Sequence, residues 1–121
     1  MKVYKLSFGS VIIINPNLAE VIINEGEVID ALKVDEYHDF LLSNLKAPFS
    51  LLINKKYSYT YTFEAQKIIG GLNEIETMAV VPSSTGGLMS TEMLLHMNAN
   101  LEGAVKIFIT RDEALAYLKK E

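Results

Sequence analysis

Short apolar runs alternate along this chain with longer amphipathic segments, and this alternation predicts most of its secondary structure. Phe49–Ile53 is an apolar run interrupted only by Ser50, which is typical of a strand that is buried on both faces. A polar and aromatic passage from Asn54 to Thr62 follows, and then a helix-like segment runs from Phe63 to about Ile69. The same order of strand, loop and helix occurs twice more, with strands at Thr77–Val81 and Val105–Ile109 and helices at Leu88 to about Met97 and after Thr110. A loop is expected from Asn98 to Gly103, and Thr110-Arg111-Asp112-Glu113 is a capping box that opens the last helix.

Three short strands are predicted before the first helix. Val3–Phe8 alternates between apolar and polar residues, and Val11–Ile14 is apolar and β-branched. Leu18–Ile23 follows the turn sequence Asn15-Pro16-Asn17 and should pair with Val11–Ile14 in an antiparallel hairpin.

The first helix is predicted from about Ala31 to Lys46. Asp30 is placed to cap its N-terminus, and Pro48 ends it. The apolar residues recur at helical spacing, and charged residues occupy the opposite side. His38 lies beside the polar face, where a solvated or capping role is expected. The apolar positions are Val34, Tyr37, Phe40, Leu41 and Leu45.

Successive strand–helix units require parallel strands, whereas the opening strands form an antiparallel part. The expected fold is therefore α/β, with a mixed sheet and about four helices. A chain of 121 residues is large enough for one domain, which we expect to span residues 1–121.

Composition narrows the classes of function. The chain has no cysteine, which excludes disulfides, thiolate nucleophiles and cysteine-based metal sites. Its net charge of −4, with eleven scattered basic residues, argues against nucleic acid or an anionic membrane as the main partner. The longest early apolar run, Val11–Ile14, is too short for a signal peptide or a spanning helix, so we expect a cytoplasmic protein without membrane insertion.

The order of elements resembles the STAS fold of anti-sigma-factor antagonists, in particular the SpoIIAA-like group of small bacterial proteins. The local similarities are the turn Glu25-Gly26-Glu27, the strand Leu51-Leu52-Ile53-Asn54 and the closing segment from Lys106 to Leu118, KIFITRDEALAYL. The resemblance covers nearly the whole chain. It implies a regulatory protein that acts by binding other proteins.

One motif of that family is absent. Its phospho-switch members carry an Asp-Ser-Ser-Gly-like turn where the central strand passes into its helix, and this chain has Tyr61-Thr62-Phe63-Glu64-Ala65 there. Thr62 stands near the phospho-acceptor position without the flanking Asp and Gly. The antagonist role therefore does not carry over, and Thr62 is predicted to be a helix N-cap.

A binding site is expected at the carboxyl ends of the parallel strands, where open α/β sheets hold their ligands. The loop at residues 54–62 carries three alternating tyrosines that would offer an amphipathic wall to a ligand or partner. The alternative, which we favour, is that they extend the strand and pack under neighbouring helices. Arg111 should stand at the same rim and offer a guanidinium to an anionic group. The candidate residues are Asn54, Lys55, Tyr57, Tyr59, Tyr61, Thr62, Ser83, Ser84, Thr85 and Arg111.

Two further patterns have competing interpretations. The loop Pro82–Gly87 would offer backbone N–H groups to an anion, although a flexible connector is the simpler interpretation. Met89, Met93 and Met97 recur every four residues, which usually indicates core packing and less often a ligand or partner surface.

No catalytic pattern is found. The two histidines lack metal-ligand spacing, no nucleophile elbow or phosphate-binding loop is present, and no cofactor or metal is expected. The first hypothesis is a non-enzymatic regulatory or protein-interaction module. The alternative is a protein that binds a small apolar ligand in a pocket at the carboxyl edge of the parallel strands. A closed, well-filled core near Tyr59 and Met93 would favour the first hypothesis, and an enclosed apolar pocket there would favour the alternative. The oligomeric state stays open, a homodimer included.

Overall fold

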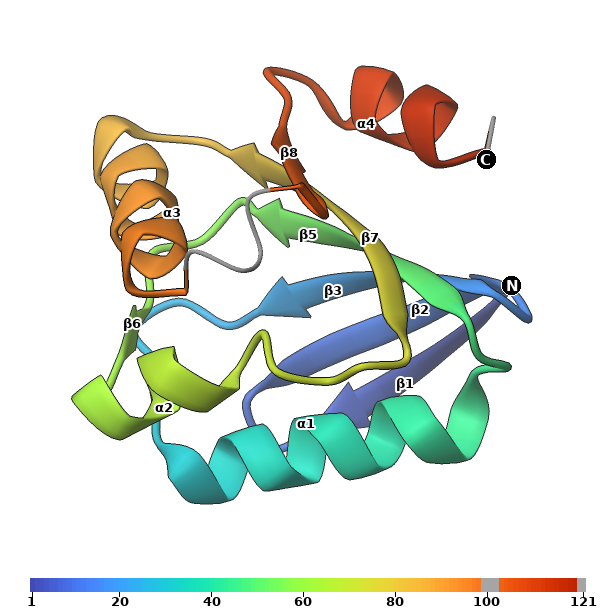
Figure 1. Cartoon of the computed structure of the whole chain (residues 1–121), viewed down its shortest axis with the longest axis horizontal. Helices are drawn as coiled ribbons and strands as arrows, with labels where there is room; N and C mark the ends of the chain where they lie inside the picture. Colours follow the sequence, from blue (N-terminus) through green and yellow to red (C-terminus); the bar gives the residue numbers. More distant parts are fainter. Residues whose placement is uncertain (99–102, 120–121) are drawn as a thin grey trace.

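The computed structural model describes residues 1–98 and 103–119, except for the side chain of Met97. Within these ranges the chain forms a six-stranded sheet, a separate pair of short strands and the helices α1 to α4 (Figure 1). The sheet contains, in order across it, β1 (Lys2–Leu6), β2 (Gly9–Asn15), β3 (Leu18–Ile23), β5 (Phe49–Lys55), β7 (Ile75–Pro82) and β8 (Val105–Ile107). The short pair is β4 (Val28–Ile29) and β6 (Thr60–Tyr61), and the helices are α1 (Ala31–Asn44), α2 (Phe63–Ile68), α3 (Thr85–Met97) and α4 (Arg111–Lys119).

The sheet is mixed, as the sequence predicts. β1, β2 and β3 pair in antiparallel fashion, whereas β3, β5, β7 and β8 are parallel neighbours. The turn between β2 and β3 is closed by the backbone N–H of Asn17, which donates to Asn15 Oδ1 at 2.9 Å. The α/β class, the antiparallel N-terminal part and the parallel later part are therefore confirmed.

Helices cover both faces of the sheet. Buried side chains of α1 and α2 share the larger core with one face, and α4 packs on the other face around a smaller core. Figure 1 shows α1 and α4 on opposite sides of the sheet, with α2 and α3 beyond the arrowheads of β3 and β5. Leu51 and Leu52 of the central strand point to opposite faces, and neither is exposed to solvent. Burial of this strand on both faces is confirmed.

Side-chain caps fix the starts of the helices where polar residues were expected to do so. The Asp30 carboxylate accepts from the Lys33 N–H at 2.9 Å. The Thr62 hydroxyl accepts from the Ala65 N–H at 3.2 Å, and the Thr110 hydroxyl accepts from Glu113 N–H at the same distance. These bonds satisfy N–H groups that have no partner within a helix. The prediction that Thr62 is an N-cap is confirmed.

Some element boundaries differ from those predicted. α1 ends at Asn44, two residues early, because the chain turns extended at Leu45 and the Lys46 N–H donates to the Pro16 carbonyl at 2.7 Å. β8 ends at Ile107 because the next residue, Phe108, packs against α4. The loop expected from Asn98 to Gly103 falls largely outside the described residues.

The parallel pair β4–β6 was not predicted. Each strand has only two residues, too few for an alternating pattern to be visible. The Thr60 N–H donates to the Glu27 carbonyl at 3.0 Å, and the Thr62 N–H donates to the Ile29 carbonyl at 2.8 Å. This pairing anchors the tyrosine-rich loop to the segment that precedes α1.

Gly9 is expected to be essential for the packing of β2 on β3. A Cβ atom at this position would lie 2.9 Å from Ile23 Cα and closer still to the Ile22 carbonyl oxygen, which are backbone atoms that cannot rotate away. Gly9→Ala should therefore lower the free energy of unfolding by about 1–3 kcal/mol. The matched control is Gly103→Ala, because a Cβ there meets no atom of the described residues within 4 Å. Urea denaturation measures both variants, and equal stabilities would contradict the prediction.

Candidate functional site

The parallel strands β5 and β7 end side by side, and the segments that follow them border an open pocket. β5 ends at Lys55 and β7 at Pro82, and the Ser83 hydroxyl donates to the Lys55 carbonyl at 2.7 Å, which ties the two strand ends together. The pocket between the tyrosine segment (Tyr57–Tyr61) and the first turns of α3 has a volume of about 410 Å³. We refer to it as the carboxyl-edge pocket. Its lining includes Lys55, Tyr59, Tyr61, Ser84, Ser90 and Met93.

Tyr59 and Tyr61 form one wall of the carboxyl-edge pocket. Their ring centroids lie 5.5 Å apart in an edge-to-face arrangement, and the Tyr61 hydroxyl donates to the Tyr59 hydroxyl at 3.3 Å. Both rings also pack against the larger core, so these two tyrosines fill space under the helices and line the pocket at once. Burial raises the pKa of both phenols, which stay neutral hydrogen-bonding groups at neutral pH. Tyr57 is more exposed and stands at the rim.

Lys55 lies at the base of the pocket and is only 5% exposed. Its Nζ atom is 5.5 Å from the centroid of the Tyr59 ring and 5.6 Å from that of Tyr61, within range of cation–π attraction. Burial lowers the pKa of the amine to about 8. No ion pair of Lys55 is found within residues 1–98 and 103–119. A buried amine without a carboxylate partner is rare in structural roles and common in binding or reactive sites.

A small apolar recess of about 50 Å³ lies beneath the pocket, between α3 and the sheet. Its walls include Val21, Ile53, Leu94 and Leu95. Lys55, Tyr59 and Tyr61 line both spaces and separate the open pocket from the apolar recess. A ligand in the pocket would therefore meet one positive charge, several hydroxyl groups and apolar surface.

The start of α3 differs from the prediction. The sequence predicted a loop through Gly87 and a helix from Leu88, but the helix begins at Thr85. The Ser84 hydroxyl accepts from the Gly87 N–H at 3.0 Å, and this cap compensates for the low helix propensity of the two glycines. The interpretation of residues 85–87 as a flexible connector is wrong. The first turn of α3 instead forms part of the pocket lining.

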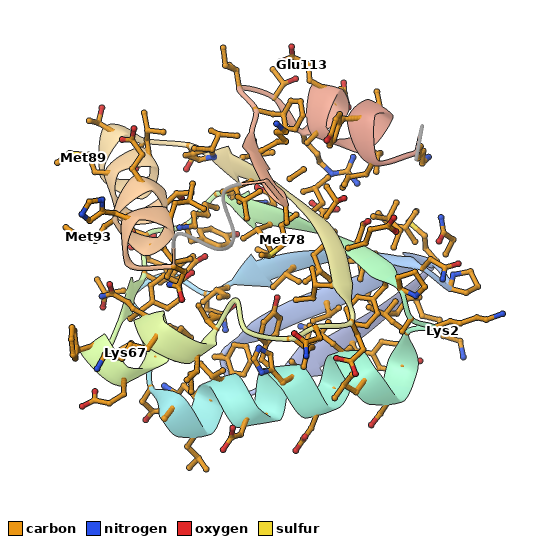
Figure 2. The ribbon with its side chains drawn as sticks, in the orientation of Figure 1. Lys2, Lys67, Met78, Met89, Met93 and Glu113 are labelled. Carbon is orange, nitrogen blue, oxygen red and sulfur yellow. The ribbon has the colours of Figure 1, made fainter. Side chains whose placement is uncertain are left out.

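Met89 and Met93 of α3 are not core residues. Met89 is 63% exposed and Met93 is 56% exposed, and Figure 2 shows both on the outer side of the helix. The favoured interpretation of these two methionines as core packing is therefore wrong, and Met93 lines the pocket. The side chain of Met97 lies outside the described part of the chain. The buried face of α3 is centred on Thr91, whose hydroxyl donates to the Gly87 carbonyl at 2.9 Å and so leaves no polar group unsatisfied.

Arg111 and Asn54 do not belong to this site, and their expected position at its rim is wrong. Both side chains lie on the α4 face of the sheet, where they hold Glu20, which is only 2% exposed. Arg111 Nη2 lies 2.8 Å from Glu20 Oε1, and Asn54 Nδ2 donates to Glu20 Oε2 at 2.9 Å. The cause is the alternation of strand residues, which sends Asn54 and Lys55 to opposite faces.

Burial alone would raise the pKa of the Glu20 carboxyl. The hydrogen bonds from Arg111 and Asn54, together with the nearby positive charges, lower the pKa below its ordinary value instead. Glu20 is therefore ionised at neutral pH, and the Arg111 guanidinium is already neutralised by it. This cluster has the geometry of a structural ion pair.

Five of the ten candidate residues line the pocket, namely Lys55, Tyr57, Tyr59, Tyr61 and Ser84. Thr62, Ser83 and Thr85 are next to lining residues in the chain but do not line it themselves. Sequence reasoning missed Gln66 and Ser90, since both belong to helices and carry no motif. The spacing of Gly86, Ser90 and Met93, one helical turn apart, is a signal that would have identified this face of α3 once its start was known.

Comparison with family models, with curated proteins and with solved structures gave no match to this chain. Among the described residues no helix is long and apolar enough to cross a membrane. The same residues contain no group of three or more histidine or acidic side chains arranged to hold a metal ion.

Proposed function

We propose that this chain is a non-enzymatic, cytoplasmic binding protein with a STAS-like fold, and that it takes a small, largely apolar ligand in the carboxyl-edge pocket. The observation that carries this proposal is the pocket itself. Its volume of about 410 Å³ falls within the range of small-molecule sites, and it lies where ligands bind in open α/β sheets. Tyr59 and Met93, which were the sequence markers for this alternative, both line it.

The STAS-like part of the proposal is supported by the element order and by the mixed sheet. The non-enzymatic part is supported by the lining of the pocket, whose described residues include no acidic side chain and no histidine that would act as a general base for a nucleophile. The Thr62 hydroxyl accepts from the Ala65 N–H as a helix cap, and the Asp and Gly that flank the family's phospho-acceptor are absent.

Ligand binding can be tested with N-phenyl-1-naphthylamine, an uncharged apolar dye whose fluorescence rises in apolar surroundings. Saturable binding to the folded protein is expected. Ser90→Trp places a large ring in the pocket and should weaken dye binding by roughly tenfold or more, which corresponds to about 1.4 kcal/mol. Met89→Trp is the matched control, because it introduces the same ring one residue away at a position that does not line the pocket.

The result that would overturn the proposal is equal dye binding by the Ser90 and Met89 variants, or no saturable binding by the wild-type protein. Thermal melts of both variants show whether the substitutions leave the fold intact. Because the wild-type chain has no tryptophan, the new indole also reports on contact with the dye in each variant.

A second candidate function is supported by the exposed apolar face of α3. Leu88, Met89 and Met93 are all exposed there, and exposed methionines are frequent in adaptable protein-binding surfaces. This observation supports the regulatory interaction module that the STAS resemblance implies, with a second copy of the chain as the simplest partner. Sedimentation equilibrium tests self-association. An average mass that rises with protein concentration in the wild type but not in Met89→Lys would support the interaction module. A wild-type protein that stays monomeric at all concentrations would argue against self-association.

A further inference from the structure

The charge of the carboxyl-edge pocket is unusual for a site that accepts only apolar molecules. Among the described residues that line the pocket, Lys55 is the only one with an ionisable amine or acid, and the residue is 5% exposed. The side chain points to the same face of β5 as Leu51 and Ile53, toward the tyrosine segment and α3. A positive charge is therefore held at the base of a pocket whose other walls are uncharged.

No carboxylate of the described residues compensates this charge. The nearest buried acid by strand pairing is Glu20, and it faces the opposite side of the sheet, where Arg111 and Asn54 occupy its oxygens. The surroundings of Lys55 Nζ are the faces of Tyr59 and Tyr61, at 5.5 and 5.6 Å from the ring centroids. Aromatic faces attract a cation but replace only part of the hydration that it loses on burial. An anion that enters the pocket would restore the missing partner.

The pocket is suited to one negative charge and not to two. It offers a single ammonium group, and a dianion such as a phosphate ester would retain an uncompensated charge in a partly enclosed space. The α3 N-terminus adds some positive potential at Ser84 and Gly86, but the Gly87 N–H is already used by the Ser84 hydroxyl. The hydroxyl groups of Tyr59 and Ser90 are available to donate to the oxygens of the anion.

We infer that the ligand is a small amphipathic monocarboxylate, whose carboxylate pairs with the Lys55 ammonium while its apolar body lies along Tyr57 and Met93; this inference rests on the function proposed above. The rim of the pocket is apolar at Tyr57 and Met93. The recess beneath Lys55 has a volume of about 50 Å³ and therefore has room for only a small chemical group. The apolar part of the ligand therefore extends outward from the charge, toward the exposed edge of α3.

The test is competition for bound N-phenyl-1-naphthylamine by molecules that share one chain and differ in the head group. Octanoate is expected to displace the dye at concentrations roughly tenfold lower than 1-octanol, since a charge-assisted hydrogen bond strengthens binding by at least about 1.4 kcal/mol. Octylamine should be weaker than both, because its charge has the same sign as Lys55. Octyl phosphate should be weaker than octanoate, and the reverse order would show that the site takes phosphate and overturn the monocarboxylate.

Substitutions at Lys55 test whether its charge causes the preference for octanoate over 1-octanol. Lys55→Met keeps most of the length of the side chain and removes the charge, so it should bring octanoate and 1-octanol to similar affinities. Lys55→Arg should retain the preference for octanoate. Lys56→Met is the matched control, since Lys56 is the neighbouring lysine and lies over the Tyr57 ring without lining the pocket. It should bind both compounds as the wild type does.

The outcomes separate the two proposals. If the wild-type protein does not bind the dye, the function proposed above is wrong, and the inference of a monocarboxylate ligand is wrong as well. If the dye binds and octanoate and 1-octanol displace it equally, the pocket binds apolar ligands and the monocarboxylate alone is wrong. This comparison uses the wild-type protein and so holds even if a Lys55 variant does not fold. Equal loss of octanoate and 1-octanol binding in Lys55→Met would likewise contradict a charge-specific role.

Discussion

Replacing Arg111 with methionine is expected to lower the free energy of unfolding by about 3 kcal/mol at neutral pH, because it leaves the Glu20 carboxylate buried without its cation. Glu20 is 2% exposed, and Arg111 holds both of its oxygens, with Nε 3.1 and 3.0 Å from Oε1 and Oε2. Urea denaturation of the variant and the wild type at several pH values measures the effect.

The loss should depend on pH in a defined direction. The pKa of Glu20 is lowered in the folded protein, so the stability it contributes is present above its unfolded pKa of about 4.5 and is lost as the pH falls through the folded value. In the variant the buried acid takes up a proton more readily. The difference between wild type and variant should therefore be complete at neutral pH and should shrink on acidification.

Two controls accompany this prediction. Adding Glu20→Gln to Arg111→Met should recover much of the loss, since the buried group is then neutral and can keep its bond to Asn54. Lys33→Met removes the partner of Glu27 from an ion pair of similar length, 3.0 Å, which is more open to solvent on the Glu27 side, and it should cost no more than about 1 kcal/mol. An Arg111 variant as mild as the Lys33 variant would show that the pair contributes little to stability.

Replacing Lys55 with methionine should have the opposite sign and stabilise the protein at neutral pH. The pKa of Lys55 is about 8 in the folded protein against an ordinary value of 10.5, which corresponds to roughly 3 kcal/mol of unfavourable burial of the charged form. Below about pH 8 both folded and unfolded chains carry the proton, and the penalty is present in full. As the pH rises from about 8 toward 10.5, only the unfolded chain keeps the proton, and the penalty is relieved.

The stability advantage of Lys55→Met should therefore be largest below about pH 8 and should disappear near pH 10.5. Tyr37, Tyr59 and Tyr61 titrate at high pH as well, because burial raises the pKa of each phenol, and they would lower the stability of both proteins alike. The difference between the two proteins isolates Lys55. Denaturation curves at intervals from about pH 7 to 10.5 measure it, with Lys56→Met as the control. A constant difference across this range would mean that the amine is not desolvated.

These two expectations differ in sign because the buried charges on the two faces of the sheet have different surroundings. Glu20 and Arg111 on the α4 face compensate each other, and their removal costs stability. Lys55 on the opposite face is not compensated by any described residue, and its removal gains stability. A group that is retained at the expense of stability is a typical mark of a functional site. The uncompensated lysine is therefore the reason to look for an anionic ligand in the carboxyl-edge pocket.

Local patterns in the sequence determined the elements of this fold. Apolar runs located the main strands, and polar residues at Asp30, Thr62 and Thr110 located three helix starts, because caps and periodicity act within a few residues of the chain. The convergence of the tyrosine segment with the segment after β7 also followed from sequence, since parallel strands place their carboxyl ends at one edge.

The tertiary structure alone decided which side chains share the site. The predicted strand ended at Ile53, so Asn54 and Lys55 were both assigned to one loop, whereas β5 continues through Lys55 and alternation sends the two residues to opposite faces. The outward position of Met89 and Met93 was decided in the same way. α3 has apolar residues on several sides, and only its packing on the sheet selects which of them is buried. The burial of Lys55 depends on residues that are distant in the sequence, such as Val21, which lies thirty-four positions before it, and no local pattern encodes it.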